Sequence, residues 1–234
     1  MKFIYFLYDI IYNKILIRLS IMRGAGYILD LLIKIDKKKY YLYYPIKIED
    51  GRIFYGNLNN IRYRSLFWKR VHEPIESELL ALLLNADDVF YDIGANIGWY
   101  ATLAAQILKK GKVYAFEPVE IVANDFRINI EKNRYQNIIL ENIALADYEG
   151  DAIINFNLDN WGLSSLQVSS PKTKQVNIKV RTLDDYIKEN KIKKVSIIKC
   201  DIEGAELLFL NGAYETIMEF MPIIFMEISP DNLK

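Results

Sequence analysis

The chain has 234 residues, of which 52% are hydrophobic and 26% are charged, a globular composition that excludes a disordered or collagen-like chain. Lys and Arg balance Asp and Glu at 30 each, so net charge gives no reason to expect a nucleic-acid partner. The single cysteine, Cys200, excludes an intrachain disulfide and favours a reducing, cytoplasmic setting. The single histidine, His72, excludes sites built from several histidines, and we interpret it as structural or surface-exposed.

The N-terminal segment, residues 1–23, is apolar and aromatic but carries Asp9, Asn13, Lys14 and Arg18. These polar residues argue against a transmembrane span, and no small-residue cleavage site of a secretory signal follows. We favour a helix that packs on the domain or on a partner subunit, which would make the protein a homo-oligomer. Peripheral membrane contact through residues 1–23 is the alternative.

Two patterns divide the rest of the chain. Between residues 40 and 70, aromatic, polar and turn residues alternate, which predicts short strands joined at Asp50–Gly51 and Gly56–Asn60. From about Glu76, helical stretches alternate with short apolar runs, which is typical of βαβ units and a parallel sheet. We therefore predict an apolar helical and β extension over residues 1–70 and an α/β domain over residues 71–234.

The elements of the α/β domain follow in order. Sheet strands are predicted at Val89–Ile93, Val113–Phe116, Ile138–Ile143, Val195–Cys200 and Ile223–Ile228. Helices are predicted at Glu76–Asn85, Ile97–Lys109, Val119–Asn133, Leu183–Asn190 and Ala205–Met218. Added β structure is expected over Ala152–Thr182.

The glycine-containing segment DIGANIG, residues 92–98, follows the first predicted sheet strand. Ligands of open parallel sheets bind at this edge. Gly94 and Gly98 let the backbone turn tightly and let a ligand approach. The N-terminus of the next helix attracts a carboxylate as well as a phosphate.

Two acidic residues indicate the kind of ligand. Asp92 precedes the first glycine, where its carboxylate would repel phosphates and attract an ammonium group, and the second glycine of a dinucleotide-binding G-x-G-x-x-G is missing. A ligand with both ammonium and carboxylate groups, such as the methionine part of S-adenosylmethionine, fits better. Glu117 ends the next strand, where an acid can accept hydrogen bonds from ribose hydroxyls. The alternative is that both acids cap their following turns.

A second acidic cluster follows a later strand. Strand alternation puts Lys199 and Asp201 on one side, and Glu227 ends the neighbouring strand. In one interpretation Asp201 is a general base that Lys199 orients. In another, Asp201 and Glu227 hold Mg²⁺, which would activate an acceptor hydroxyl. The third is that Asp201 or Glu203 caps the helix at Ala205 and Lys199 pairs with an acid.

Several separated blocks together resemble the FkbM family of S-adenosylmethionine-dependent methyltransferases. The similarity runs from about Glu73 to Ile228 and rests on YDIGANIGWYA, VYAFEP, NIALAD, WGLSSL, VRTLDDYI, IIKCDIEGAEL and IIFMEI in this order. The resemblance implies a Rossmann-like class I methyltransferase sheet with helices on both faces. Known members methylate hydroxyl oxygens of secondary metabolites, sugars and glycolipids.

The resemblance also implies roles for individual residues. The methionine end of the cofactor would contact Asp92, Gly94, Asn96 and Gly98, the ribose Glu117, and the adenine Asn142. Trp161, Ser164 and Ser165 would lie near the acceptor, where Trp161 can stack on a sugar face; a β-turn anchored by a packed Trp161 is the alternative.

The chain ends at Lys234 and leaves no residues for the C-terminal β-hairpin of that fold. We predict an O-methyltransferase of glycan biosynthesis that acts on a hydroxyl of a sugar, glycolipid or similar small metabolite. A nicotinamide-dependent oxidoreductase and a truncated, non-catalytic cofactor-binding protein are the alternatives.

Overall fold

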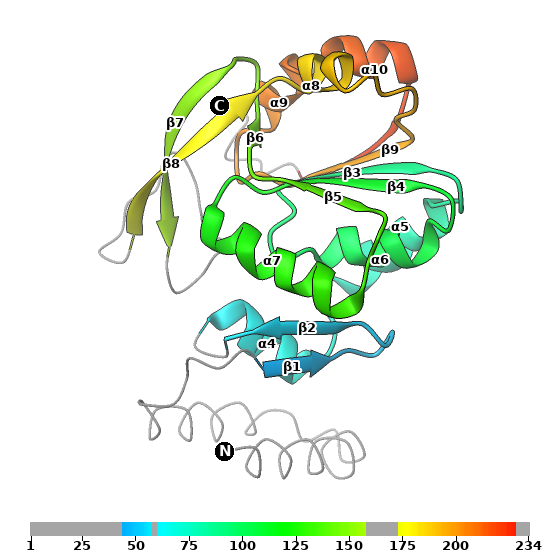
Figure 1. Ribbon diagram of the computed structural model, residues 1–234, viewed down its shortest axis with the longest axis vertical. Helices are drawn as coiled ribbons and strands as arrows, with labels where there is room; N and C mark the ends of the chain where they lie inside the picture. Colours follow the sequence, from blue (N-terminus) through cyan, green and yellow to red (C-terminus); the bar gives the residue numbers. More distant parts are fainter. Residues whose placement is uncertain (1–43, 58–59, 158–172, 228–234) are drawn as a thin grey trace. The chain divides into compact units, whose positions relative to one another are not determined.

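The structure, a computed structural model, describes residues 44–57, 60–157 and 173–227. Its centre is a parallel sheet of five strands in the order β10-β9-β3-β4-β5 (Figure 1). The strands are β3 (Val89–Ile93), β4 (Lys112–Phe116), β5 (Ile138–Glu141), β9 (Ile197–Cys200) and β10 (Ile223–Met226). The chain builds outward from β3 on one side and then returns to the other side, so β3 lies at the switch point. This order confirms the predicted Rossmann-like α/β sheet.

Helices cover both faces of the sheet (Figure 1). One face carries α5 (Pro74–Leu83), α6 (Trp99–Ile107) and α7 (Glu120–Asn133), and the other carries α8 (Leu183–Glu189), α9 (Glu206–Asn211) and α10 (Tyr214–Phe220). On the second face, sheet and helix side chains form one apolar core that includes Tyr91, Phe116, Ile198, Leu183, Phe209 and Ala213. Burial of this apolar surface is the main force that holds the layers together.

The single helix predicted over Ala205–Met218 is wrong, because the chain breaks between α9 and α10. Gly212 stands at the break, where a Cβ atom would lie 1.9 Å from the carbonyl oxygen of Ala146. The carbonyl of Gly212 also accepts a hydrogen bond from the Asp184 N–H at 3.1 Å. The close approach of the Ala146 and Asp184 segments to Gly212 therefore ends α9 at this point.

An inserted sheet lies between β5 and α8 in the chain. It consists of β6 (Ala144–Leu145), β7 (Gly150–Asn157) and β8 (Thr173–Arg181), in the order β6-β8-β7. β7 and β8 pair antiparallel, whereas β6 pairs parallel with β8. The predicted β excursion is therefore confirmed for its described residues, 152–157 and 173–181.

The segment before residue 70 is a hairpin followed by a helix. β1 (Tyr44–Lys47) and β2 (Ile53–Gly56) pair antiparallel on either side of the predicted Asp50–Gly51 turn. A strand after Asn60 was expected, and this is wrong: α4 (Ile61–Lys69) begins there. The Asn60 side chain accepts a hydrogen bond from the Arg62 N–H at 2.8 Å and so caps the helix. The domain boundary at residue 70 stays a prediction.

A buried arginine ties the hairpin to α6. Arg52 is 2% exposed, and its guanidinium carbon lies 4.3 Å from the ring centroid of Trp99. It donates to the Thr102 hydroxyl at 2.8 Å and to the Trp99 carbonyl, and it forms an ion pair with Asp50 at 2.7 Å. These contacts fix the hairpin against the first turn of α6.

In the described part of the chain no helix has the length and hydropathy that a membrane crossing requires. Residues 1–23 lie outside the described residues, so membrane contact and oligomerisation through this segment stay predictions.

We expect Arg52→Ala to lower the free energy of unfolding by about 2–3 kcal/mol, because it removes buried packing and the buried hydrogen bonds to Trp99 and Thr102. Urea denaturation followed by circular dichroism measures this. Lys109→Ala, at an exposed lysine of the turn after α6, is the control and should change stability by less than about 0.5 kcal/mol. Equal effects of the two substitutions would contradict the role given to Arg52.

Candidate active site

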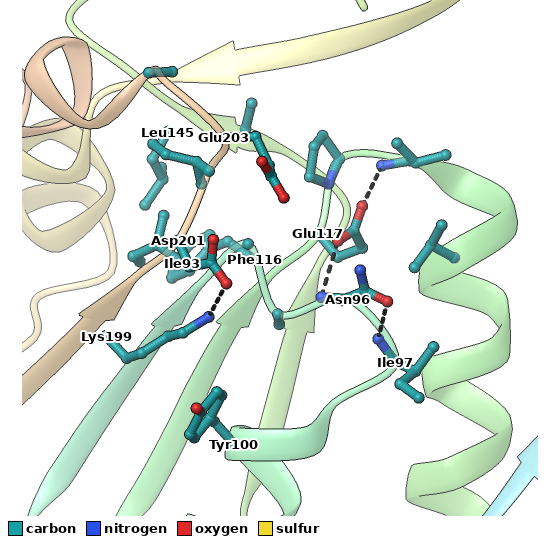
Figure 2. A pocket seen from close by; sticks show the side chains of 18 of the residues that line it. Ile93, Asn96, Ile97, Tyr100, Phe116, Glu117, Leu145, Lys199, Asp201 and Glu203 are labelled. Carbon is teal, nitrogen blue, oxygen red and sulfur yellow. Dashed lines mark hydrogen bonds and ion pairs between the residues drawn. The ribbon is translucent and has the colours of Figure 1, made fainter. Parts of the chain in front are cut away.

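A cavity of ≈ 370 Å³ opens at the carboxyl edge of the central sheet. Its walls come from the ends of β3, β4 and β9, from α4, and from the inserted sheet. Figure 2 shows the carboxylates of Glu117, Asp201 and Glu203 around a common space. The volume is within the range of small-molecule sites.

The bend after β3 forms the floor of this cavity. Gly94 has φ +77°, and a Cβ atom there would lie 2.0 Å from the carbonyl oxygen of Asp201. Gly98 has φ +86°, and a Cβ atom there would lie 2.0 Å from the ring of Phe126 on α7. Both glycines are thus required for close backbone packing, in addition to any access they give a ligand. Asn96 has φ +52°, and its Oδ1 accepts from the Ile97 N–H at 2.9 Å.

Glu117 joins the ends of two neighbouring strands. Its Oε2 accepts from the Asn96 N–H of the bend, and its Oε1 accepts from the Val119 N–H, both at 2.9 Å. Burial raises the pKa of Glu117 to about 7, although these two N–H groups oppose the shift. The carboxylate therefore braces the bend and still lines the cavity.

Asn142 holds the backbone at Glu117 through its side-chain amide. Its Nδ2 donates to the carbonyls of Glu117 at 2.8 Å and Pro118 at 3.0 Å. The cavity wall next to it is formed by Ile143 and Ala144, and Asn142 itself is not part of the lining. Its contact with an adenine stays a prediction.

Asp92 lies inside the protein and does not line the cavity. Its side chain is buried, with Oδ2 accepting from the Ala101 N–H at 2.9 Å and Oδ1 3.9 Å from the Lys199 ammonium. Asp92 and Lys199 are register partners on β3 and β9, which explains their proximity. Burial raises the pKa of Asp92 to about 6 against the opposing effect of Lys199. Direct contact of Asp92 with a ligand ammonium stays a prediction.

Lys199 links Asp92 to the cavity. Its ammonium donates to Oδ2 of Asp201 at 3.2 Å and lies 4.9 Å from the ring centroid of Tyr100 (Figure 2). Burial alone would lower the pKa of Lys199, but Asp92 and Asp201 outweigh it and raise the pKa. Lys199 therefore carries a positive charge and orients Asp201.

Two further acids, Glu203 and Glu227, lie at the same edge of the sheet as Asp201. Burial, followed by Asp201 and Glu227, raises the pKa of Glu203 to about 7, and Asp201 raises that of the exposed Glu227. The Mg²⁺ interpretation finds no support here: within the described ranges, no three His, Cys, Asp or Glu side chains are grouped so that they could hold a metal ion.

One wall of the cavity comes from residues that the sequence analysis did not assign to the site. Arg62, His72 and Glu73 line it together with Tyr100. The Tyr100 hydroxyl donates to Oε2 of Glu73 at 2.5 Å, and His72 Nε2 lies 3.2 Å from Oε1 of Glu73. Burial lowers the pKa of His72 despite Glu73. The sequence feature that could have indicated the position of Glu73 is Pro74. Proline is favoured at the first position of a helix, so it predicts Glu73 at the N-cap of α5.

The predicted acceptor residues Trp161, Ser164 and Ser165 lie outside the described residues. Their roles stay predictions.

Comparison with known families identifies one domain. The model of the Methyltransferase FkbM domain matches residues 92–233. This range contains the bend, Glu117, the Lys199–Asp201 pair and the inserted sheet.

Curated proteins with similar sequences are methyltransferases by name. The 2-O-methyltransferase NoeI of Sinorhizobium fredii is 27% identical over 177 residues, covering 68% of this chain and 70% of that protein. The hexuronic acid methyltransferase AglP of Haloferax volcanii is 29% identical over 140 residues, covering 58% and 56%. Methyltransferase 1 of Beauveria bassiana is 22% identical over 161 residues, covering 61% and 65%. The chain thus spans less than two thirds of the latter two relatives.

Solved structures with some similarity include the precorrin-6y C5,15-methyltransferase of Geobacter metallireducens, with 14% identity, 70% of this chain and 66% of that chain covered, and a TM-score of 0.41. An rRNA methylase of Streptococcus thermophilus has 15% identity, 64% and 65% coverage, and a TM-score of 0.37.

We expect Gly94→Ala to be more destabilising than Gly51→Ala. Both positions have positive φ, but a Cβ atom at Gly51 meets nothing within 4 Å, whereas at Gly94 it meets the backbone of Asp201. The backbone strain, roughly 1–2 kcal/mol, is shared, and overpacking should add about 1–3 kcal/mol at Gly94 only. Urea denaturation of both variants measures the difference; similar free energies of unfolding would show that the bend tolerates a side chain.

Proposed function

Because the chain belongs to the FkbM methyltransferase family and is an S-adenosylmethionine-dependent methyltransferase, we propose that it methylates a hydroxyl oxygen of a sugar or glycolipid. The observation that carries this proposal is the Lys199–Asp201 pair, which presents an oriented carboxylate to the cavity beside the bend and Glu117. The names of two relatives, a 2-O-methyltransferase and a hexuronic acid methyltransferase, support a sugar acceptor.

The residues of the cavity fit the cofactor. The N-terminus of α6 has Gly98 as its N-cap, and although the Ala101 N–H already donates to Asp92, the Trp99 and Tyr100 N–H groups can serve a carboxylate. Glu117 keeps free lone pairs after accepting two backbone N–H groups, so it can also accept the ribose hydroxyls. We keep Gly94, Asn96 and Gly98 as the bend against which the methionine end lies, and Asn142 as the residue next to the adenine.

S-adenosylmethionine supplies an activated methyl group on a positively charged sulfur. An aliphatic hydroxyl is a weak nucleophile while it keeps its proton, so the protein must align the acceptor and take this proton. In our proposal Asp201 accepts the proton at its carboxylate. Lys199 holds Asp201 in place and favours negative charge nearby.

The remaining assignments complete the proposal. The acceptor lies against the inserted sheet, which contributes Tyr148, Ala152 and Ile178 to the cavity wall, and Trp161, Ser164 and Ser165 follow β7 in the chain. Residues 71–234 form the methyltransferase domain, and the protein acts in the cytoplasm.

We expect Asp201→Asn to lower the initial rate of methyl transfer by about 10²–10⁴-fold, because the amide cannot accept a proton. Transfer of a radiolabelled methyl group to methyl glycosides of hexoses, deoxyhexoses and hexuronic acids measures the rate, and calorimetry with S-adenosylhomocysteine checks that the cofactor still binds.

Glu206→Gln is the control, since Glu206 lies in the same turn but outside the cavity lining. An unchanged rate in Asp201→Asn would remove Asp201 as the base. Cofactor binding by the wild type without transfer to any acceptor would favour the non-catalytic alternative.

A further inference from the structure

The position of Asp92 leaves open which group binds the cofactor's ammonium. Asp92 is 0% exposed, one oxygen accepts from the first turn of α6, and the other faces Lys199. The charge of Asp92 is therefore already opposed by a buried cation, and its side chain lies behind the cavity wall. An ammonium group inside the cavity needs a different carboxylate, because a buried charge is costly unless it is paired.

Four acids line the cavity in the described structure: Glu73, Glu117, Asp201 and Glu203. Glu117 is already assigned to the ribose hydroxyls in the proposed function, and Asp201 is paired with Lys199. Glu203 follows β9 and faces the space between Asp201 and Glu117 (Figure 2). Glu73 accepts a hydrogen bond from the hydroxyl of Tyr100, a residue of the first turn of α6.

The position of Glu73 next to α6 matters because of the geometry of an amino acid. Ammonium and carboxylate are bound to the same carbon atom, so the group that binds the ammonium must lie beside the group that binds the carboxylate. The N–H groups at the start of α6 suit the carboxylate. The Tyr100 side chain extends from this first turn, and its hydroxyl donates to Oε2 of Glu73 at 2.5 Å, so the Glu73 carboxylate is held on the same cavity wall as the start of α6.

The side chains that contact Glu73 directly carry no positive charge near pH 7. They are the phenol of Tyr100, whose pKa burial raises, and the imidazole of His72, whose pKa burial lowers, so both are neutral near pH 7. Within the described residues no lysine or arginine forms an ion pair with Glu73. The Lys199 ammonium interacts with Glu73 only at longer range, and Nη1 of Arg62 lies 3.3 Å from the His72 ring nitrogen. The Glu73 carboxylate is thus partly exposed and is oriented by Tyr100 and His72, but it forms no ion pair with a lysine or arginine of the described residues.

The backbone of Glu73 indicates that this arrangement has a cost. Its φ of +44° and ψ of 66° are left-handed, which is unfavourable for a residue with a side chain. It stands at the N-cap of α5, yet its side chain makes no capping hydrogen bond. The side chain turns toward the cavity instead of stabilising its own helix, as expected for a residue with a binding role.

We propose that the Glu73 carboxylate binds the positively charged amino group of the cofactor's methionine, with Tyr100 and His72 orienting it. This inference rests on the proposed use of S-adenosylmethionine. It assigns to Glu73 the contact that the sequence analysis expected from Asp92. Asp92 then acts indirectly, by holding the first turn of α6 and Lys199.

Two ligands that differ only in the amino acid part test the proposal. S-adenosylhomocysteine carries the ammonium and the carboxylate, whereas 5′-methylthioadenosine keeps the adenosine and the sulfur and lacks both. Calorimetry on the full chain measures the first affinity, and displacement of S-adenosylhomocysteine measures the second. Glu73→Gln should weaken S-adenosylhomocysteine by about 10–100-fold, the effect of a charged hydrogen bond, and should change 5′-methylthioadenosine by less than about twofold.

Controls separate this role from a structural one. Glu76→Gln, at an exposed acid in the first turn of the same helix, should change neither affinity. Tyr100→Phe removes the hydroxyl that orients Glu73 and should give a smaller loss confined to S-adenosylhomocysteine; it provides the test if Glu73→Gln does not fold.

The proposal is overturned if Glu73→Gln leaves both ligands unchanged or weakens both equally. It is also overturned if Asp92→Asn, and not Glu73→Gln, causes a loss restricted to S-adenosylhomocysteine. A wild-type chain that binds neither ligand would reject the proposed function itself, and this outcome differs from all the others.

Discussion

The cavity depends on the two hydrogen bonds that the Glu117 carboxylate accepts. One comes from the bend after β3 and the other from the start of α7, so a single buried side chain fixes the distance between the ends of two strands. The cost is a carboxylate out of water, seen in the pKa near 7. A well-placed acceptor in the free protein spares the ligand the cost of ordering it on binding.

Next to Glu117, three charged side chains lie one behind another between the protein interior and the cavity. Asp92 is enclosed, Lys199 lies between it and the cavity, and Asp201 faces the cavity. Because Lys199 sits between two acids, it stays charged in spite of its burial. Buried ion pairs of this kind add little to the free energy of unfolding, because the cost of removing water from the charges offsets much of their attraction. Their main effect here is to hold the Asp201 carboxylate in place.

The fold and the bend were predictable because short-range patterns determine them. The strand Val89–Ile93 is a short run, apolar except for Asp92, that ends before a glycine, and it was placed correctly. The break at Gly212 was missed because it depends on contact with Ala146. The helix α4 was missed because it depends on packing against the hairpin, where the Tyr63 ring lies against Gly56. In the site, the burial of Asp92 and the position of Glu73 depend on tertiary neighbours, namely the register with Lys199 and the hydroxyl of Tyr100. Local sequence motifs predict which residues lie at the carboxyl edge of the sheet. They do not predict which of these side chains faces the cavity and which is buried behind it.

The inserted sheet has a consequence for how the protein can diversify. β6, β7 and β8 form a sheet of their own, and the register of the central strands does not involve them. Substitutions on their cavity-facing side therefore change the shape of one wall while the β3 bend and its braces keep their geometry. The geometry of the bend after β3 and that of the wall opposite it can therefore change independently of each other.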